Sequence, residues 1–204
     1  QTRYDNLVPR HCVKMLGPEF ALIRNDIKKY RPRSPRKIAK VKNILVNFGS
    51  SDPKNYCLKL IKMLQEHQSE FAQYDFLFVT GAMSSCKDEL SSISDKLSFC
   101  NAIESSDDFG RLMSEADLFI GASGSTTWER GILGLPAIVL STSKNQFKIA
   151  KDGNGIFHVF IDNLFDPSMI LTILRDNNLY SKISEKSYAL MQRCFDSTLS
   201  KYLV

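Results

Sequence analysis

From Asn43 onward, short apolar runs alternate with longer segments of helical pattern, and this alternation restricts the fold more than any other feature. Ile44 to Phe48 is an apolar run that ends at Gly49. The segment from Pro53 to His67 then carries apolar residues on one broad helical face. Strand and helix alternate roughly five or six times in this way, with strands that are almost continuously apolar. The pattern predicts a Rossmann-like α/β fold, in which helices cover both faces of a parallel sheet.

The other elements follow from the same two periodicities. Asp52 and Pro53 suit the N-cap and the first position of the helix that follows the first strand. Further strands are predicted at 75–79, 97–100, 118–121, 136–140 and 158–161, and further helices at 87–96, 108–116, 126–133, 146–152, 167–177 and 181–202.

The first part of the chain lacks this pattern. Residues 1–42 are interpreted as a linker and approach segment, with a short strand or turn at 20–23, and residues 43–204 as the domain. The run from Lys28 to Lys42 is rich in Lys and Arg and holds Pro32 and Pro35, which is typical of a solvated loop.

Composition excludes several classes of protein. A net charge of +5 is mildly basic, and the basic run holds a single aromatic residue, Tyr30, which does not make a stacking surface, so we expect no nucleic-acid partner. The 5 cysteines are scattered without a Cys-x-x-Cys pair, which argues against a disulfide framework or a zinc site and favours reduced thiols in the cytoplasm. No apolar run approaches the ~20 residues that span a bilayer, and no signal peptide is visible. We expect no metal and no cofactor.

Three loops follow predicted strands and so lie at the carboxyl edge of the sheet, where ligands bind in open parallel sheets. The loop at 49–53 has Gly49 for a sharp turn and precedes a helix start, which suits either a phosphate or an ordinary turn capped by Asp52. The loop at 121–130 is rich in small residues and also precedes a helix. The loop at 141–146 ends in Asn145 and Gln146, whose amides suit sugar hydroxyls or simply a polar helix start.

Glu129 has two interpretations. A carboxylate one turn inside a helix can accept the hydroxyls of a ribose. However, Thr126-x-x-Glu129 is also the pattern of a capping box, which spacing alone favours. Trp128 is interpreted as a packing residue. The glycine spacing of this loop does not match a dinucleotide fingerprint.

Nucleophilic catalysis has no support in the sequence. His11, His67 and His158 lack an acid or nucleophile partner at a suggestive spacing, and no Gly-x-Ser-x-Gly elbow occurs.

Several of these segments, taken in order, resemble a known family. The chain is similar, roughly from Cys12 to Gly155, to the carboxyl half of the UDP-2,4-diacetamido-2,4,6-trideoxy-β-L-altropyranose hydrolases of pseudaminic acid synthesis. These enzymes have the two-domain GT-B fold, as does the glucosaminyltransferase that makes lipid II. The segments that carry the resemblance are 16–24, 44–53, 112–118, 124–130, 133–136 and 145–146.

The resemblance implies a role for each matching residue. It predicts a nucleotide-binding half that holds UDP or a UDP-sugar, with an amino-terminal domain as its partner. Glu129 would bind the ribose, and Asn145 and Gln146 would meet the sugar, with Asn145 at the reacting region. Ile103 and Arg24 would lie by the uracil. The diphosphate would contact Gly49, Ser50, Ser51, Gly124, Ser125 and Thr126.

Two departures from the family pattern affect the predicted activity. Ser50 stands where the family has a second glycine, and no match to the family's Gly-x-Gly-His motif, which carries the catalytic base, occurs in this chain. We therefore expect the chain alone not to hydrolyse a UDP-sugar. Two alternatives to a hydrolase stay open: the donor-binding domain of a GT-B glycosyltransferase, and a non-catalytic domain that binds a nucleotide sugar within a larger protein.

Overall fold

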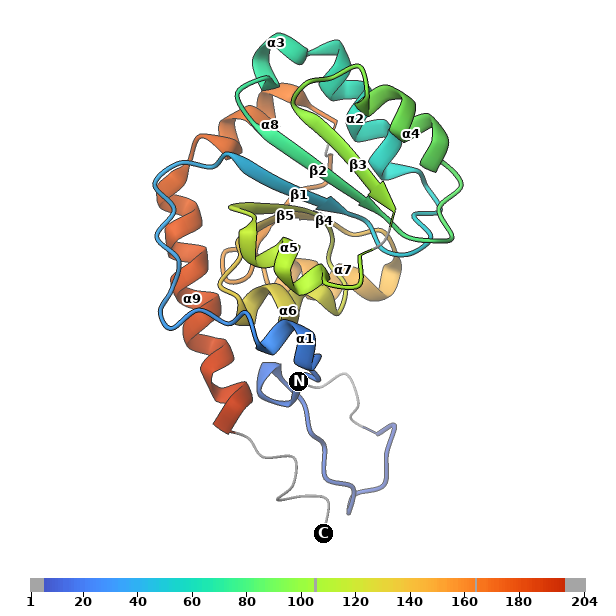
Figure 1. Cartoon of the computed structure of the whole chain (residues 1–204). Helices are drawn as coiled ribbons and strands as arrows, with labels where there is room; N and C mark the ends of the chain where they lie inside the picture. Colours follow the sequence, from blue (N-terminus) through green and yellow to red (C-terminus); the bar gives the residue numbers. More distant parts are fainter. Residues whose placement is uncertain (1–5, 105, 164, 197–204) are drawn as a thin grey trace.

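The computed structural model describes residues 6–104, 106–163 and 165–196. Within these ranges, six parallel strands form one sheet in the order β3-β2-β1-β4-β5-β6 (Figure 1). This is the predicted Rossmann-like fold, which is therefore confirmed. The strands are β1 (Asn43–Asn47), β2 (Asp75–Thr80), β3 (Cys100–Glu104), β4 (Leu118–Ala122), β5 (Ala137–Leu140) and β6 (Val159–Phe160).

Two helical layers sandwich the sheet (Figure 1). One face is covered by α2 (Tyr56–Glu66), α3 (Gln68–Phe71), α4 (Lys87–Ser94) and α8 (Pro167–Leu174). The other face lies against α1 (Asn25–Lys28), α5 (Phe109–Glu115), α6 (Thr126–Ile132) and the later part of α9 (Asn177–Asp196). The remaining elements are the short helix η2 (Pro18–Phe20) and α7 (Lys144–Asp152).

Alternation along β1 shows how the sequence builds both layers. Ile44 and Val46 belong to the core under α2, whereas Leu45 belongs to the core over α6. Successive strand residues point to opposite faces, so a strand covered on both sides must be apolar throughout.

The start of α2 differs from the prediction. The helix begins at Tyr56, three residues later than expected, because Asp52 and Asn55 adopt left-handed backbone angles in a tight turn that the Asn55 N–H closes on the Asp52 carbonyl at 2.8 Å. Pro53 therefore does not occupy the first helical position. Asp52 still caps the helix, because its carboxylate accepts the N–H groups of Tyr56 at 2.9 Å and Cys57 at 2.8 Å.

The third strand also differs from the prediction, because β3 begins at Cys100 and not at Leu97. The apolar residues Leu97 and Phe99 are buried in a turn that leads into β3, and the Cys100 N–H closes this turn on the Leu97 carbonyl at 3.0 Å. Apolar side chains in a turn can fill a core as well as strand residues do. The apolar pattern therefore predicted the start of the strand three residues too early.

The basic run is not wholly a solvated loop. Arg36 is half-buried, and its guanidinium donates to the carbonyls of Leu133 at 2.8 Å, Ala116 at 2.6 Å and Met113 at 3.2 Å. These carbonyls end α5 and α6, where a cation is favourable. Burial lowers the pKa of Arg36 to about 10, which leaves it charged at neutral pH. The interpretation as a solvated loop is therefore wrong at this residue.

The last helix differs in extent. It begins at Asn177, and Figure 1 shows it passing beside the sheet at the end opposite to the strand arrowheads. The predicted continuation to Tyr202 lies outside the described residues. In the described ranges, no helix is both long and apolar enough to cross a membrane. No cluster of His, Cys, Asp or Glu side chains suited to a metal occurs in those ranges either.

Candidate functional site

The strand order places two of the three predicted loops side by side. β1 and β4 are neighbours in the sheet, and the chain leaves them toward opposite faces, into α2 from β1 and into α6 from β4. Such a reversal opens a crevice beyond the carboxyl ends of the two strands, and this is where open α/β sheets bind ligands.

The loop after β1 is tightly held by the protein itself. Gly49 has a φ of 96°, and its N–H bonds the side chain of Asn47 at 3.1 Å. The exposed residues Ser50 and Ser51 follow, and a β-carbon on Gly81 would lie 2.1 Å from the Ser50 Cα, so the loops after β1 and β2 pack backbone on backbone. The N–H groups that begin α2 are occupied by Asp52.

The loop after β4 is open by comparison. No side chain caps the start of α6, and within the described chain the N–H groups of Gly124, Ser125 and Thr126 have no hydrogen-bond partner. A β-carbon on Gly124 would meet only Gln146 Nε2, at 3.6 Å, so the protein leaves space directly over this loop. Free N–H groups at a helix start suit an anion.

Glu129 does not form the capping box that spacing favoured. Its carboxylate instead accepts a hydrogen bond from Arg24 Nε at 2.8 Å, across 105 residues of sequence. The Glu129 side chain is 13% exposed and that of Arg24 54%. Partial burial of the guanidinium opposes its charge, but the bond and charge of Glu129 outweigh this, so the pKa of Arg24 is raised. Two residues assigned by resemblance to the same nucleoside therefore meet in the fold.

The short helix α1 brings Arg24 to this position. A β-carbon on Gly110 would lie 2.6 Å from the Asp26 carbonyl, so α1 rests directly on α5. The Tyr30 hydroxyl donates to Asp108 at 2.5 Å, and this bond lowers the pKa of the Asp108 carboxyl. Asp108 in turn caps α5 by accepting the Arg111 N–H at 3.3 Å.

Ile103 lies further along the same edge, at the end of β3, and is 37% exposed. β2 and β1 separate its strand from β4, a distance of roughly 14 Å at the usual strand spacing. A ligand in contact with both Ile103 and Glu129 must therefore be extended along the edge.

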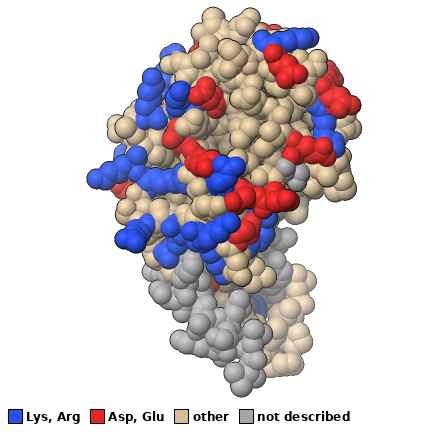
Figure 2. Space-filling view, viewed as in Figure 1, with Lys and Arg blue, Asp and Glu red and all other residues tan. Residues whose placement is uncertain are grey.

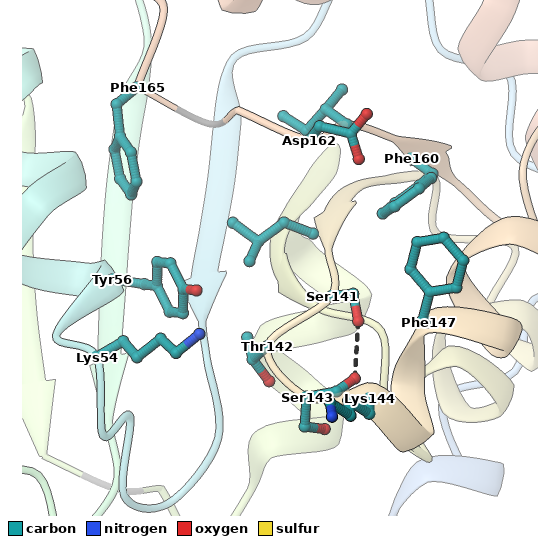
Figure 3. Close-up of a pocket in the computed structure, with 12 residues that line it drawn as sticks. Lys54, Tyr56, Ser141, Thr142, Ser143, Lys144, Phe147, Phe160, Asp162 and Phe165 are labelled. Carbon is teal, nitrogen blue, oxygen red and sulfur yellow. Dashed lines mark hydrogen bonds between the residues drawn. The ribbon is translucent and has the colours of Figure 1, made fainter.

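The third loop adjoins the second and borders a pocket of about 530 Å³ (Figure 3). Gln146 Oε1 accepts the Thr142 hydroxyl at 2.8 Å, and the exposed Asn145 accepts the Ser143 hydroxyl at 2.5 Å. Lys54 and Tyr56 enter the pocket from the start of α2, as Figure 3 shows. The pocket is lined by Lys54, Tyr56, Leu140, Ser141, Thr142, Ser143, Lys144, Phe147, Phe160, Ile161, Asp162 and Phe165.

Sequence reasoning did not identify the pocket residues on α2 and after β6. The only local signal was their position just beyond strand ends. The Tyr56 and Phe165 rings, which lie nearly parallel with centroids 6.1 Å apart, come from segments far apart in the chain.

None of the three histidines lines the pocket. His158 is fully buried, and its Nε2 bonds the Ala150 carbonyl at 2.9 Å. Burial, and then the charge of Arg130, lower the pKa of His158 to about 4. His67 pairs with Glu70 at 3.0 Å, and His11 is exposed. Trp128 packs edge-on against Phe157 with ring centroids 5.3 Å apart, which confirms its packing role.

Charged side chains of both signs lie on the face of the molecule that carries α1 and α5. Figure 2 shows Lys and Arg gathered over the lower part of the face, with acidic side chains directly beside them. Pairs such as Lys29 with Asp108 and Arg111 with Glu115 account for part of this arrangement.

Comparison with curated proteins finds partial relatives, whereas no protein-family model matches the chain. The uncharacterized protein MJ1062 of Methanocaldococcus jannaschii is 33% identical over 138 residues, which is 64% of this chain and 27% of that protein. The spore coat polysaccharide biosynthesis protein SpsG of Bacillus subtilis is 28% identical over 135 residues, 66% of this chain and 39% of that protein. The chain thus spans well under half the length of these relatives.

Solved structures share the fold at low identity. The UDP-GlcNAc 2-epimerase of Neisseria meningitidis, bound to UDP-GlcNAc, matches 80% of this chain and 44% of its own with a TM-score of 0.59 and 16% identity. MurG of Acinetobacter baumannii matches 86% of this chain and 52% of its own with a TM-score of 0.58 and 17% identity. The chain accordingly shares its α/β fold with about half of each of these GT-B proteins.

Proposed function

We propose that this chain is the nucleotide-binding half of a GT-B enzyme that acts on a UDP-sugar in carbohydrate synthesis. The observation that carries the proposal is the Arg24–Glu129 pair, which lies one helical turn from the uncapped start of α6. A carboxylate for ribose hydroxyls and free N–H groups for phosphate are thereby combined at the switch point of the sheet.

Each part of the ligand has a matching group. The N–H groups of Gly124, Ser125 and Thr126 bind the diphosphate, while Gly49, Ser50 and Ser51 face it from the neighbouring loop. Glu129 turns from Arg24 to the ribose hydroxyls. The other contacts are Arg24 and Ile103 at the uracil, and Asn145 and Gln146 at the sugar.

The same geometry assists any reaction in which UDP leaves the sugar. Negative charge grows on the diphosphate as the glycosidic bond breaks, and N–H groups already directed at it stabilise that charge without rearrangement. The comparisons favour transfer of the sugar to an acceptor. SpsG is named for polysaccharide biosynthesis, a process in which sugars are joined to acceptors.

Hydrolysis is the second candidate reaction, and the motifs from Gly124 to Arg130 and at Asn145–Gln146 favour it by resemblance. Water then replaces the acceptor hydroxyl, and the general base comes from the other half of the enzyme. Product analysis separates the two reactions: a sugar released in buffer alone supports hydrolysis, whereas UDP release that requires an acceptor supports transfer.

The first test is calorimetric titration of UDP into the chain, with ADP and NAD as competitors and Glu129→Ala as the variant. We expect UDP-selective binding that weakens by about tenfold or more in the variant, because ribose hydroxyls lose a charged acceptor. Glu115→Ala, which removes an exposed carboxylate from α5, is the matched control and should bind UDP normally. Equal affinity for UDP and ADP, or an unchanged Glu129→Ala, contradicts the proposal.

A further inference from the structure

A fully buried guanidinium lies behind the candidate phosphate loop. Arg130 points back toward the start of α6, as long side chains in helices do. Its Nε bonds the Thr126 carbonyl at 3.3 Å, and its Nη2 bonds the Thr127 hydroxyl at 3.0 Å. The group therefore touches the first turn of the helix whose free N–H groups face the crevice.

This cation has no carboxylate in contact with it among the described residues. Its guanidinium carbon lies 4.7 Å from the centroid of the Phe119 ring, and Nη1 has no hydrogen-bond partner in the described chain. Glu129, the nearest acid in sequence, is bonded to Arg24. A buried charge without a paired anion is unfavourable in a folded protein unless something else balances it.

The neighbouring His158 side chain does not compensate the positive charge of Arg130. Since Nε2 of His158 bonds a carbonyl, it carries the proton, so Nδ1 is a buried acceptor that likewise lacks a partner in the described residues. Burial, and then the charge of Arg130, lower the pKa of the imidazole and keep it neutral at pH 7. The exposed guanidinium of Arg24 is paired with two carboxylates, Glu129 at 2.8 Å and Asp26 at 3.5 Å, whereas the buried guanidinium of Arg130 is paired with none in the described chain.

We propose that Arg130 is an electrostatic positioning residue for the diphosphate, which supplies a fixed positive charge from behind the Gly124–Thr126 loop without touching the ligand. The inference rests on the proposed function and adds the group that makes the site selective for a doubly charged phosphate. In the low-dielectric interior a buried charge acts over several ångströms with little screening by salt. Its bonds to Thr126 and Thr127 also hold the free N–H groups in place.

A purely structural role for Arg130 and an electrostatic role predict different effects on the affinities for UDP and uridine when Arg130 is replaced. Loosening of α6 weakens every ligand contact, including those of Glu129 with the ribose, so uridine and UDP lose affinity together. Loss of a charge behind the loop weakens UDP and leaves uridine nearly unaffected. The ratio of the two affinities therefore separates the two roles.

The experiment is calorimetry of UDP and uridine with the wild-type chain, Arg130→Gln and Arg130→Lys, each checked for folding by circular dichroism. We expect the UDP-to-uridine affinity ratio to fall by about tenfold or more in Arg130→Gln and to stay within about threefold of wild type in Arg130→Lys. Lys148→Gln, which removes an exposed cation from α7, should leave the ratio unchanged.

The outcomes are distinguishable. A wild-type chain that binds neither ligand contradicts the proposed function, and this inference with it. A wild type that binds UDP, with an unchanged ratio in Arg130→Gln, overturns this inference alone. If Arg130→Gln does not fold, the ³¹P NMR titration of bound UDP decides: a β-phosphate pKa below that of free UDP in both wild type and Arg130→Lys supports the inference, and an unshifted pKa overturns it.

Discussion

The loops after β1 and β4 occupy equivalent places in the fold but have different chemistry. Both follow a buried parallel strand, and both lead into a helix at the switch point of the sheet. In the first, Asp52 fills the start of α2 with a resident carboxylate. In the second, the start of α6 has no side-chain cap. Topology alone therefore does not make an anion site, because the side chains at the helix start decide whether its N–H groups are free.

The buried side chains behind the two loops also differ in charge. Behind the first lies Cys57, whose thiol pKa is raised by burial and by the charge of Asp52, so it stays neutral. Behind the second lies Arg130, fully buried and charged, with His158 beside it. The start of α2 is thus capped and lies over neutral side chains, whereas the start of α6 is uncapped and lies over a buried positive charge.

The largest expected effect is on acid stability and tests the charged interior behind the second loop. Because the pKa of His158 is about 4 in the folded chain and ordinarily 6.5, the unfolded chain takes up the proton first as pH falls. Stability should therefore be lost between about pH 6.5 and pH 4, by about 3 kcal/mol in total. Urea unfolding of the wild type and His158→Gln at several pH values measures this, because Gln keeps a donor for the Ala150 carbonyl and does not titrate. Parallel curves for the two proteins would contradict the assignment.

The second prediction makes the open loop resemble the closed one. Ser125→Asp places a carboxylate at the start of α6, where it competes with the diphosphate for the N–H groups and repels it. UDP affinity should fall by about a hundredfold, while the folded state is not destabilised, because an acid is favourable at a helix start. Ser92→Asp on the exposed surface of α4 is the control. Retained UDP binding in Ser125→Asp would place the phosphate elsewhere.

The reverse change opens the first loop. Asp52→Ala leaves the Tyr56 and Cys57 N–H groups without an acceptor, so the free energy of unfolding should fall by about 2 kcal/mol. Asp88→Ala, an exposed acid in the first turn of α4, should change it by less than about 0.5 kcal/mol. Chemical denaturation measures both, and equal effects would show that Asp52 does not hold α2.

The smallest effects come from the two glycines. Gly49 has a φ of 96°, so Gly49→Ala should cost about 1 kcal/mol of stability through backbone strain. Gly124→Ala should leave stability nearly unchanged, since its β-carbon meets only Gln146 Nε2 at 3.6 Å. It should nevertheless lower UDP affinity several-fold, because the methyl group takes space that the ligand needs. Thermal unfolding and calorimetry on both variants give the comparison, which fails if Gly124→Ala is the less stable.

Much of the fold was predictable because the local pattern and the tertiary environment agree. The apolar strands β1, β4 and β5 are buried on both faces. Their continuous apolar pattern and the strand propensity of their residues therefore predict the same element. Predictions failed where the same residue pattern is compatible with two different local structures. Leu97 and Phe99 fill the core from a turn, and Thr126 and Glu129 match a capping box that the fold does not form.

The sequence by itself determined the order of elements, the parallel sheet and the three loops at its carboxyl edge, because these follow from residue type and spacing along the chain. Only the tertiary structure decided which loop is open, which group Glu129 contacts, and that Arg36 is half-buried and Arg130 fully buried. The physical reason is that these outcomes depend on partners distant in sequence, as Arg24 is from Glu129, or on backbone turns that no periodicity reports. The charge behind the β4 loop is therefore a property of the packed chain and not of any motif in it.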